Sequence, residues 1–131
     1  MKIIETLDFQ IGGFGSQTDR IIYRDNKVNH ELFESDYILK STEPTAKEWE
    51  QFFDVMDNLK VWSWKKDYND EGMLDGTQWE LIIKIKGKRG RKIYGSNAYP
   101  EPKGTFTSFI RALNKLSKSK IEFEEEDLYY E

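Results

Sequence analysis

The stretch from Val61 to Pro100 constrains the fold of this 131-residue chain more than any other. Within it, residues 78–86 alternate between apolar and polar side chains, so the apolar ones share one face of a predicted strand. These are Trp79, Leu81, Ile83 and Ile85. A turn between Gly87 and Gly90 follows, and the chain returns as a partner strand. Because a strand with one apolar face must bury it, the pattern predicts an antiparallel sheet covered on one side.

Two other segments carry apolar stripes with helical spacing. Residues from about 45 to 59 and from about 105 to 117 each place apolar side chains at i, i+3, i+4, i+7 and i+10. The first stripe is Trp49, Phe52, Phe53, Met56 and Leu59; the second is Phe106, Phe109, Ile110, Leu113 and Leu116. Thr45 and Glu48, directly after Pro44, form a capping-box pattern. We therefore predict two amphipathic helices.

The rest of the chain predicts further strands and turns. Residues 1–41 fit an antiparallel meander interrupted by a glycine-rich loop at 12–16 and by a turn at Asp25-Asn26. Residues 61–64 alternate like a short strand, whereas residues 65–76 are polar and rich in turn formers. Ile121 and Phe123 fit a last short strand before an acidic tail.

The fold class that accommodates this order is α+β: an antiparallel β-sheet with two amphipathic helices packed on one face. We expect a single domain over residues 1–131. Its predicted parts are an N-terminal meander (1–41), a helix (about 45–59), strands (61–95), a second helix (about 105–117) and an acidic tail (122–131).

Composition narrows the classes of function. The chain has no cysteine, which excludes disulfides, thiolate catalysis and cysteine-based zinc sites. His30 is the single histidine, and no calcium-loop motif is present, so we expect no metal and no cofactor. The glycines at 12–16 precede a predicted strand rather than a helix, which argues against a phosphate loop. Charges interrupt the first apolar run, so we expect no signal peptide, no membrane span and a cytoplasmic protein.

Charge gives two further expectations. The net charge of −4 disfavours a nucleic-acid partner, although the cations between Lys84 and Lys92 leave phosphate contacts at a hairpin tip as an alternative to edge protection. Carboxylates gather in one loop, at Asp67, Asp70, Glu71 and Asp75. No spacing singles out a catalytic pair among them, so we do not expect an enzyme.

Aromatic residues supply the candidate binding site. Trp62 and Trp64 share one face of their predicted strand, and Tyr99 follows Asn97 closely. Such rings and amides can line a groove for a peptide or a sugar. The alternative is that the tryptophans are core and Asn97 is a turn residue. The candidate binding residues are Asp75, Asn97, Tyr99, Trp62 and Trp64.

The sequence also resembles short bacterial proteins that share two motifs. In these, an Asp-Gly-x-x-Trp strand is followed by a Gly-x-Asn-x-Tyr-Pro turn and a helix. Here the motifs are Asp75-Gly76-Thr77-Gln78-Trp79 and Gly95-Ser96-Asn97-Ala98-Tyr99-Pro100, and the resemblance covers roughly the last sixty residues. The resemblance implies a bacterial α+β domain, and it implies no particular activity.

Two hypotheses of function follow. The first is a non-enzymatic binding or interaction protein, of the small acidic kind that neutralises another protein such as a toxin. It is motivated by the negative charge, the aromatic residues and the missing catalytic set. The alternative is a small-ligand or carbohydrate-binding module that uses an aromatic groove. The sequence leaves the oligomeric state open.

Overall fold

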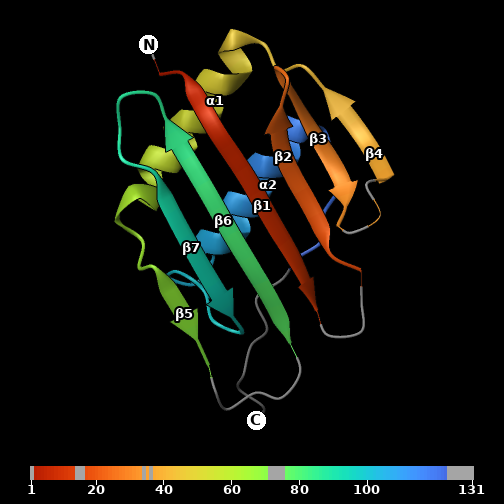
Figure 1. The fold of residues 1–131 in the computed structure, drawn as a ribbon. Helices are drawn as coiled ribbons and strands as arrows, with labels where there is room; N and C mark the ends of the chain where they lie inside the picture. Colours follow the sequence, from red (N-terminus) through yellow and green to blue (C-terminus); the bar gives the residue numbers. More distant parts are fainter. Residues whose placement is uncertain (1, 14–16, 34, 36, 71–75, 124–131) are drawn as a thin grey trace.

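The computed structural model describes residues 2–13, 17–33, 35, 37–70 and 76–123. In this part of the chain, seven strands form one sheet in the order β4-β3-β2-β1-β6-β7-β5 (Figure 1). The strands are β1 (Ile4–Gly13), β2 (Asp19–Arg24), β3 (Lys27–Leu32), β4 (Tyr37–Thr42), β5 (Asp67–Asn69), β6 (Thr77–Ile85) and β7 (Arg91–Ser96). The helices are α1 (Ala46–Asn58), the short 3-10 helix η1 (Val61–Ser63) and α2 (Thr105–Ser117).

β1 lies in the middle of the sheet. It pairs antiparallel with β2 on one side and with β6 on the other. The remaining pairs are antiparallel as well, except that β5 runs parallel to β7. The predicted α+β class, with an antiparallel sheet and two helices, is confirmed, and the predicted meander corresponds to β1 through β4.

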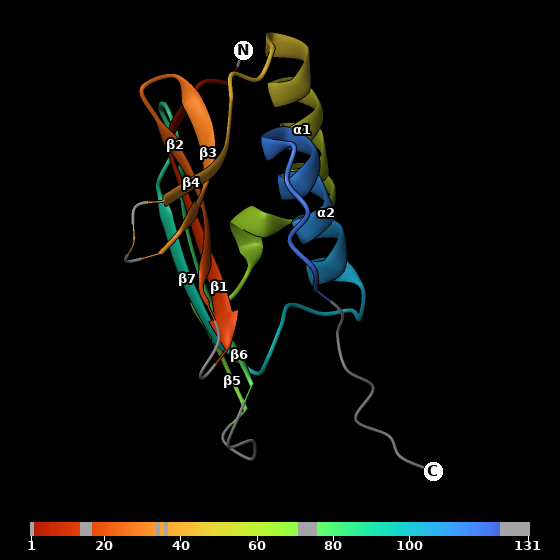
Figure 2. The ribbon, with the colours of Figure 1, turned by 90° about the vertical axis from the view of Figure 1, so that its right-hand side faces the viewer.

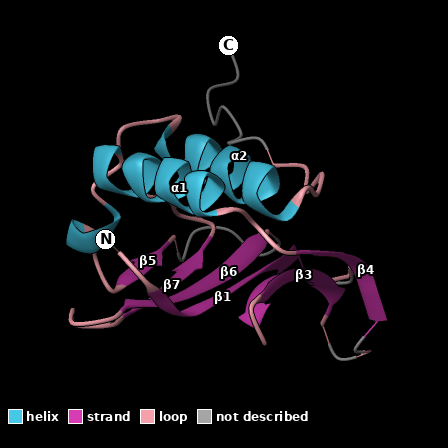
Figure 3. Ribbon diagram, turned by 90° about the horizontal axis from the view of Figure 1, so that it is seen from above, coloured by secondary structure: helices cyan, strands magenta, loops and turns pink. Residues whose placement is uncertain are grey.

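Ring contacts place the two helices relative to the sheet. Phe9 on β1 meets Phe109 of α2 at 5.3 Å between ring centroids. Phe9 pairs with Ile21 across the β1–β2 ladder, so Tyr23, two residues further along β2, lies on the same face. The Tyr23 ring meets Trp49 of α1 edge-on at 5.6 Å. Both helices therefore contact the face of the sheet that carries Phe9, and Figures 2 and 3 show them side by side over that face.

The core fills the space between this face and the helices. Leu7, Phe9 and Ile11 of β1 are buried, and so is the alternating set of β6 that begins at Trp79. Both helical stripes are buried there through Phe52, Phe53 and Met56 in α1 and Phe106, Phe109, Ile110, Leu113 and Leu116 in α2. The apolar side chains that recur every two residues in the strands and about every 3.6 residues in the helices thus pack together in one layer.

A capping box begins α1. The Thr45 hydroxyl accepts from the Glu48 N–H at 3.1 Å, and the Glu48 carboxylate accepts from the Thr45 N–H at 2.9 Å. Lys118, just after α2, donates to the other carboxylate oxygen at 2.8 Å. Mainly because of this bond from Lys118, and also because of the Thr45 N–H, the pKa of Glu48 falls to about 2. Glu48 thus begins one helix and links it to the end of the other.

Acidification is expected to remove the stabilisation that the Glu48 charge provides. The pKa of Glu48 is lower in the folded chain than its ordinary 4.5. This stabilisation is therefore present above about pH 4.5 and is lost as the pH falls toward the folded pKa. Glu48→Gln keeps a capping side chain without the charge. The difference in urea midpoint between wild type and Glu48→Gln should shrink between about pH 5.5 and pH 2.5. A difference that stays constant would contradict a role for the charge.

Three local predictions differ from the structure. Residues 61–63 form η1 rather than a strand, because Lys60 takes a left-handed conformation (φ 57°) that turns the chain back under α1. Residues 67–69, predicted to be loop, form β5 on the free edge of β7. Residues 118–123 contain no strand; the Asn114 side chain instead holds Ile121 through its backbone. Within the described residues, no helix is long and apolar enough to cross a membrane.

Candidate functional site

The tryptophan of the Asp-Gly-x-x-Trp pattern joins the two recognised motifs by packing. Trp79 is 2 % exposed, and its indole N–H donates to the Ala98 carbonyl at 3.1 Å. Its ring lies directly over Gly95: a Cβ at that position would stand 2.0 Å from the Trp79 Nε1 atom. The glycine of the second motif is therefore needed because the tryptophan of the first occupies its side-chain space.

Asn97 and Tyr99 complete this structural unit. Asn97 takes a left-handed conformation (φ 56°), and its N–H donates to the Thr77 carbonyl at 2.8 Å. Its amide fills the space over Gly76, where a Cβ would fall 1.5 Å from Asn97 Oδ1. Tyr99 is half-buried, and its ring centroid lies 5.1 Å from that of Phe106. These contacts support the alternative in which Asn97 is a turn residue.

The structure places the two candidate tryptophans apart from each other. Trp64 is 6 % exposed and packs against Phe109 in the core, at 5.3 Å. Trp62 is half-buried on the other side of η1, where its indole N–H donates to Asp57 at 2.9 Å. Hydrogen bonds from Lys2 and from Trp62 lower the pKa of the Asp57 carboxyl. Asp75 lies outside the described residues, and the other four candidates do not gather around one cavity.

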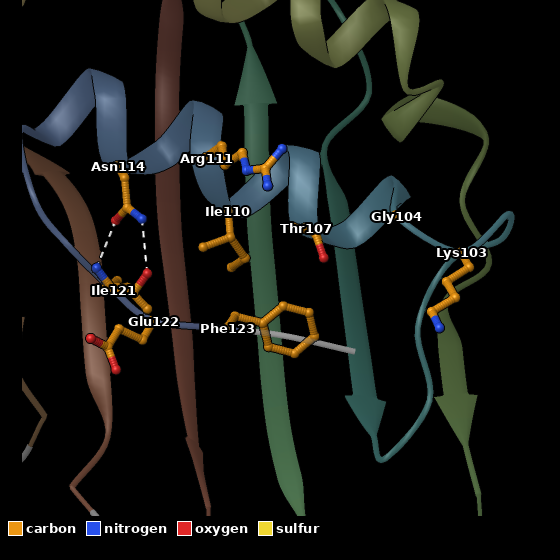
Figure 4. A pocket seen from close by; sticks show the side chains of 9 residues that line it. All are labelled: Lys103, Gly104, Thr107, Ile110, Arg111, Asn114, Ile121, Glu122 and Phe123. Atoms are coloured by element: carbon orange, nitrogen blue, oxygen red, sulfur yellow. Dashed lines mark hydrogen bonds between the residues drawn. The ribbon is translucent and has the colours of Figure 1, made fainter. Parts of the chain in front are cut away.

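A hollow of about 900 Å³ lies between α2 and the chain that follows it (Figure 4). Asn114 closes one end, because its amide donates to the Ile121 carbonyl and accepts from the Ile121 N–H, both at 2.9 Å. Phe123, at the other wall, lies against Tyr99 with ring centroids 5.0 Å apart. The two bonds from Asn114 thus hold the chain after α2 against the helix at that end of the hollow.

The face of the sheet away from the helices carries fixed charges. Arg20 on β2 makes a two-pronged ion pair with Asp8 on β1, at 2.9 and 2.7 Å. Glu31 on β3 is 2 % exposed and accepts from Arg24 at 3.0 Å and from Asn29 at 3.3 Å. Because these side chains already pair with one another, they are poor candidates for binding a charged ligand.

β4 is an edge strand whose apolar side chains are exposed. Tyr37 is 62 % exposed, Ile38 51 % and Leu39 48 %. Phe33, which precedes β4, is also exposed, but its ring lies 5.7 Å from the Arg20 guanidinium and lines a hollow with Tyr94, away from β4. The pairing register shifts between His30 and Glu31, which leaves Leu39 as an extra residue in β4. We call β4, residues 37–42, the edge patch. The sequence contained a signal for it, three consecutive apolar residues without alternation, which we interpreted only as strand.

A second groove, of about 550 Å³, lies between α1 and the start of β1. Its apolar lining is Ile3, Ile4, Tyr23, Ala46, Trp49 and Phe53, and its charged rim is Lys2, Glu50 and Asp54. We call it the aromatic groove. Here the sequence carried no distinct signal, because Trp49 and Phe53 belong to a stripe typical of buried helices.

Among the described residues, no cluster of histidine and carboxylate side chains has the geometry of a metal site. His30, on the helix side of the sheet, is buried and pairs with Asp19 at 2.8 Å. No protein-family model, curated protein or solved structure matches the chain.

Proposed function

We propose that this chain is a non-enzymatic protein-binding domain, and that it binds an extended segment of a partner protein along β4. The partner strand would add to the sheet beside β4. We further propose a bacterial cytoplasmic setting, in which a small acidic protein of this kind neutralises its partner.

One observation carries the proposal: the edge patch is apolar, exposed and at the end of a sheet. An edge strand presents a row of unpaired N–H and C=O groups, and proteins ordinarily protect it with charges, proline, bulges or a covering segment. In β4 this protection is limited to Lys40 and the bulge at Leu39, and five of its six residues are exposed. Strand addition supplies main-chain hydrogen bonds for affinity and side-chain contacts for selectivity, which is what such an edge offers.

The alternative of a carbohydrate-binding groove has less support. Trp64 is buried under α2, and Trp62 and Asn97 already have local hydrogen-bond partners. A sugar site needs rings and amides that converge on one open cavity. The protein-binding hypothesis requires only a surface that is already exposed.

The matched test compares Tyr37→Glu with Tyr94→Glu. Both tyrosines are exposed, but Tyr94 lies on β7, near the opposite edge of the sheet from β4. Tyr37→Glu should reduce capture of a specific partner from a lysate of the source organism about tenfold or more, a loss of about 1.4 kcal/mol in binding. Tyr94→Glu should leave capture unchanged. Equal capture by both variants would overturn the proposal.

Two further measurements locate the partner. With the captured protein added, hydrogen exchange should slow at those amides of residues 37–42 that point away from β3, since these gain partners on strand addition. The free chain should sediment as a monomer. A dimer that Tyr37→Glu dissociates would mean that a second copy occupies β4, which contradicts a different protein as the occupant.

A further inference from the structure

We infer that the aromatic groove binds an arginine side chain of a partner polypeptide. The site is separate from the edge patch, because it lies between α1 and the start of β1, and the inference does not rest on the proposed strand addition.

The groove is large enough to hold one long side chain and its backbone. Along α1 it runs from Ala46 to Asp54, a rise of about 12 Å at 1.5 Å per residue. Its 550 Å³ lies within the range of about 300–1,000 Å³ of ligand pockets. Ile3, which is 51 % exposed, lies at one wall and offers an apolar surface to the stem of the side chain.

The aromatic rings that line the groove pack against one another. Trp49 stacks on Phe53 at 5.8 Å with an interplanar angle of 24°, and Tyr23 meets Trp49 at 88°. Trp49 is also the one tryptophan whose indole N–H makes no hydrogen bond within the described residues. The other three indoles donate to Asp57, Leu59 and Ala98. A cation is attracted to the electron-rich faces of such rings.

The charges at the rim select the sign of the ligand. Glu50 and Asp54 are one turn apart on α1, both exposed, and neither makes an ion pair within the described part of the chain. Like charges at i and i+4 repel each other, so a cation between them relieves that repulsion. The cation at the rim, Lys2, pairs with Asp57 and makes no ion pair with Glu50 or Asp54.

Arginine fits this arrangement better than lysine. A guanidinium is planar, so it can stack on the Trp49 ring while its N–H fork reaches two carboxylates. A lysine ammonium is a strongly hydrated point charge and offers no plane to stack. The geometry thus selects a planar cation on an apolar stem.

The test is an NMR titration of the full chain with Nα-acetyl-arginine N-methylamide. The indole signal of Trp49 should shift and saturate, whereas those of Trp62, Trp64 and Trp79 should stay in place. The matched citrulline derivative, which keeps the shape but lacks the charge, should bind at least about fivefold more weakly. The lysine derivative should also bind more weakly.

Variants separate the carboxylates from general charge. Glu50→Gln with Asp54→Asn should weaken binding of the arginine derivative about five- to tenfold. Glu43→Gln with Asp67→Asn changes the net charge equally at exposed sites outside the groove and should have no effect. Equal binding of citrulline or lysine, an equal effect of the two double variants, or no shift of Trp49 at about 50 mM would each overturn the inference.

Discussion

Replacing Trp79 with alanine is expected to lower the free energy of unfolding by about 3–5 kcal/mol, the range for truncation of a buried large aromatic residue. Trp79 is 2 % exposed, its ring lies 4.5 Å from that of Phe106, and its indole holds the Ala98 carbonyl. Truncation would leave a cavity between β6 and α2 and release the turn that leads into α2. Such a loss is a large part of the total stability of a typical domain, about 5–15 kcal/mol.

Urea unfolding followed by circular dichroism measures this loss without relying on tryptophan emission. Trp62→Ala is the matched control, because Trp62 is only half-buried at the margin of the core and takes no part in the ring contacts that Trp79 makes with Phe106, Trp64 and Tyr68. The control should lose distinctly less stability than Trp79→Ala. Equal losses would mean that the cluster around Trp79 is not the principal contact between the sheet and α2.

Gly95→Ala is expected to destabilise the chain by about 1–3 kcal/mol or more, because it overpacks a filled site. The added Cβ would lie 2.0 Å from Trp79 Nε1 and 2.2 Å from Cε2, so the indole must move and lose its bond to Ala98. Gly90→Ala, in the turn before β7, is the matched control. There the nearest atoms are in the Lys84 side chain at 3.6 Å, and the change should stay within about 0.5 kcal/mol.

A double-mutant cycle identifies the colliding group. In a Trp79→Leu background, where the indole is absent, Gly95→Ala should cost clearly less than in the wild type. Additive losses would mean that the cost of Gly95→Ala arises from the strand itself rather than from the tryptophan above it.

The sequence predicted those elements whose burial follows a regular period. The stripes that begin at Trp49 and Phe106 identified both helices, and the alternation that begins at Trp79 identified β6. A regular period of apolar residues arises when one helix or strand packs one face against a core. It can therefore be recognised from the sequence of that helix or strand alone.

Features that depend on several elements were not predictable in the same way. The alternating pattern of residues 61–64 is too short to distinguish a strand from a short turn of helix. The left-handed conformation of Lys60 favours the helical turn. β5 is polar and exists because β7 has a free edge. The aromatic groove combines the ends of β1 and β2 with α1, so no single segment carries its pattern.

The central place of β1 affects how the chain is made on the ribosome. Ile4 pairs with Ile85, which follows it by about 80 residues, so one side of β1 stays open until β6 has been synthesised. The cover from α2 arrives later still, with Phe106 and the residues after it. Since pairing between distant residues is slow and leaves apolar strands exposed meanwhile, β1 and its neighbours stay prone to aggregation until β6 and α2 are in place.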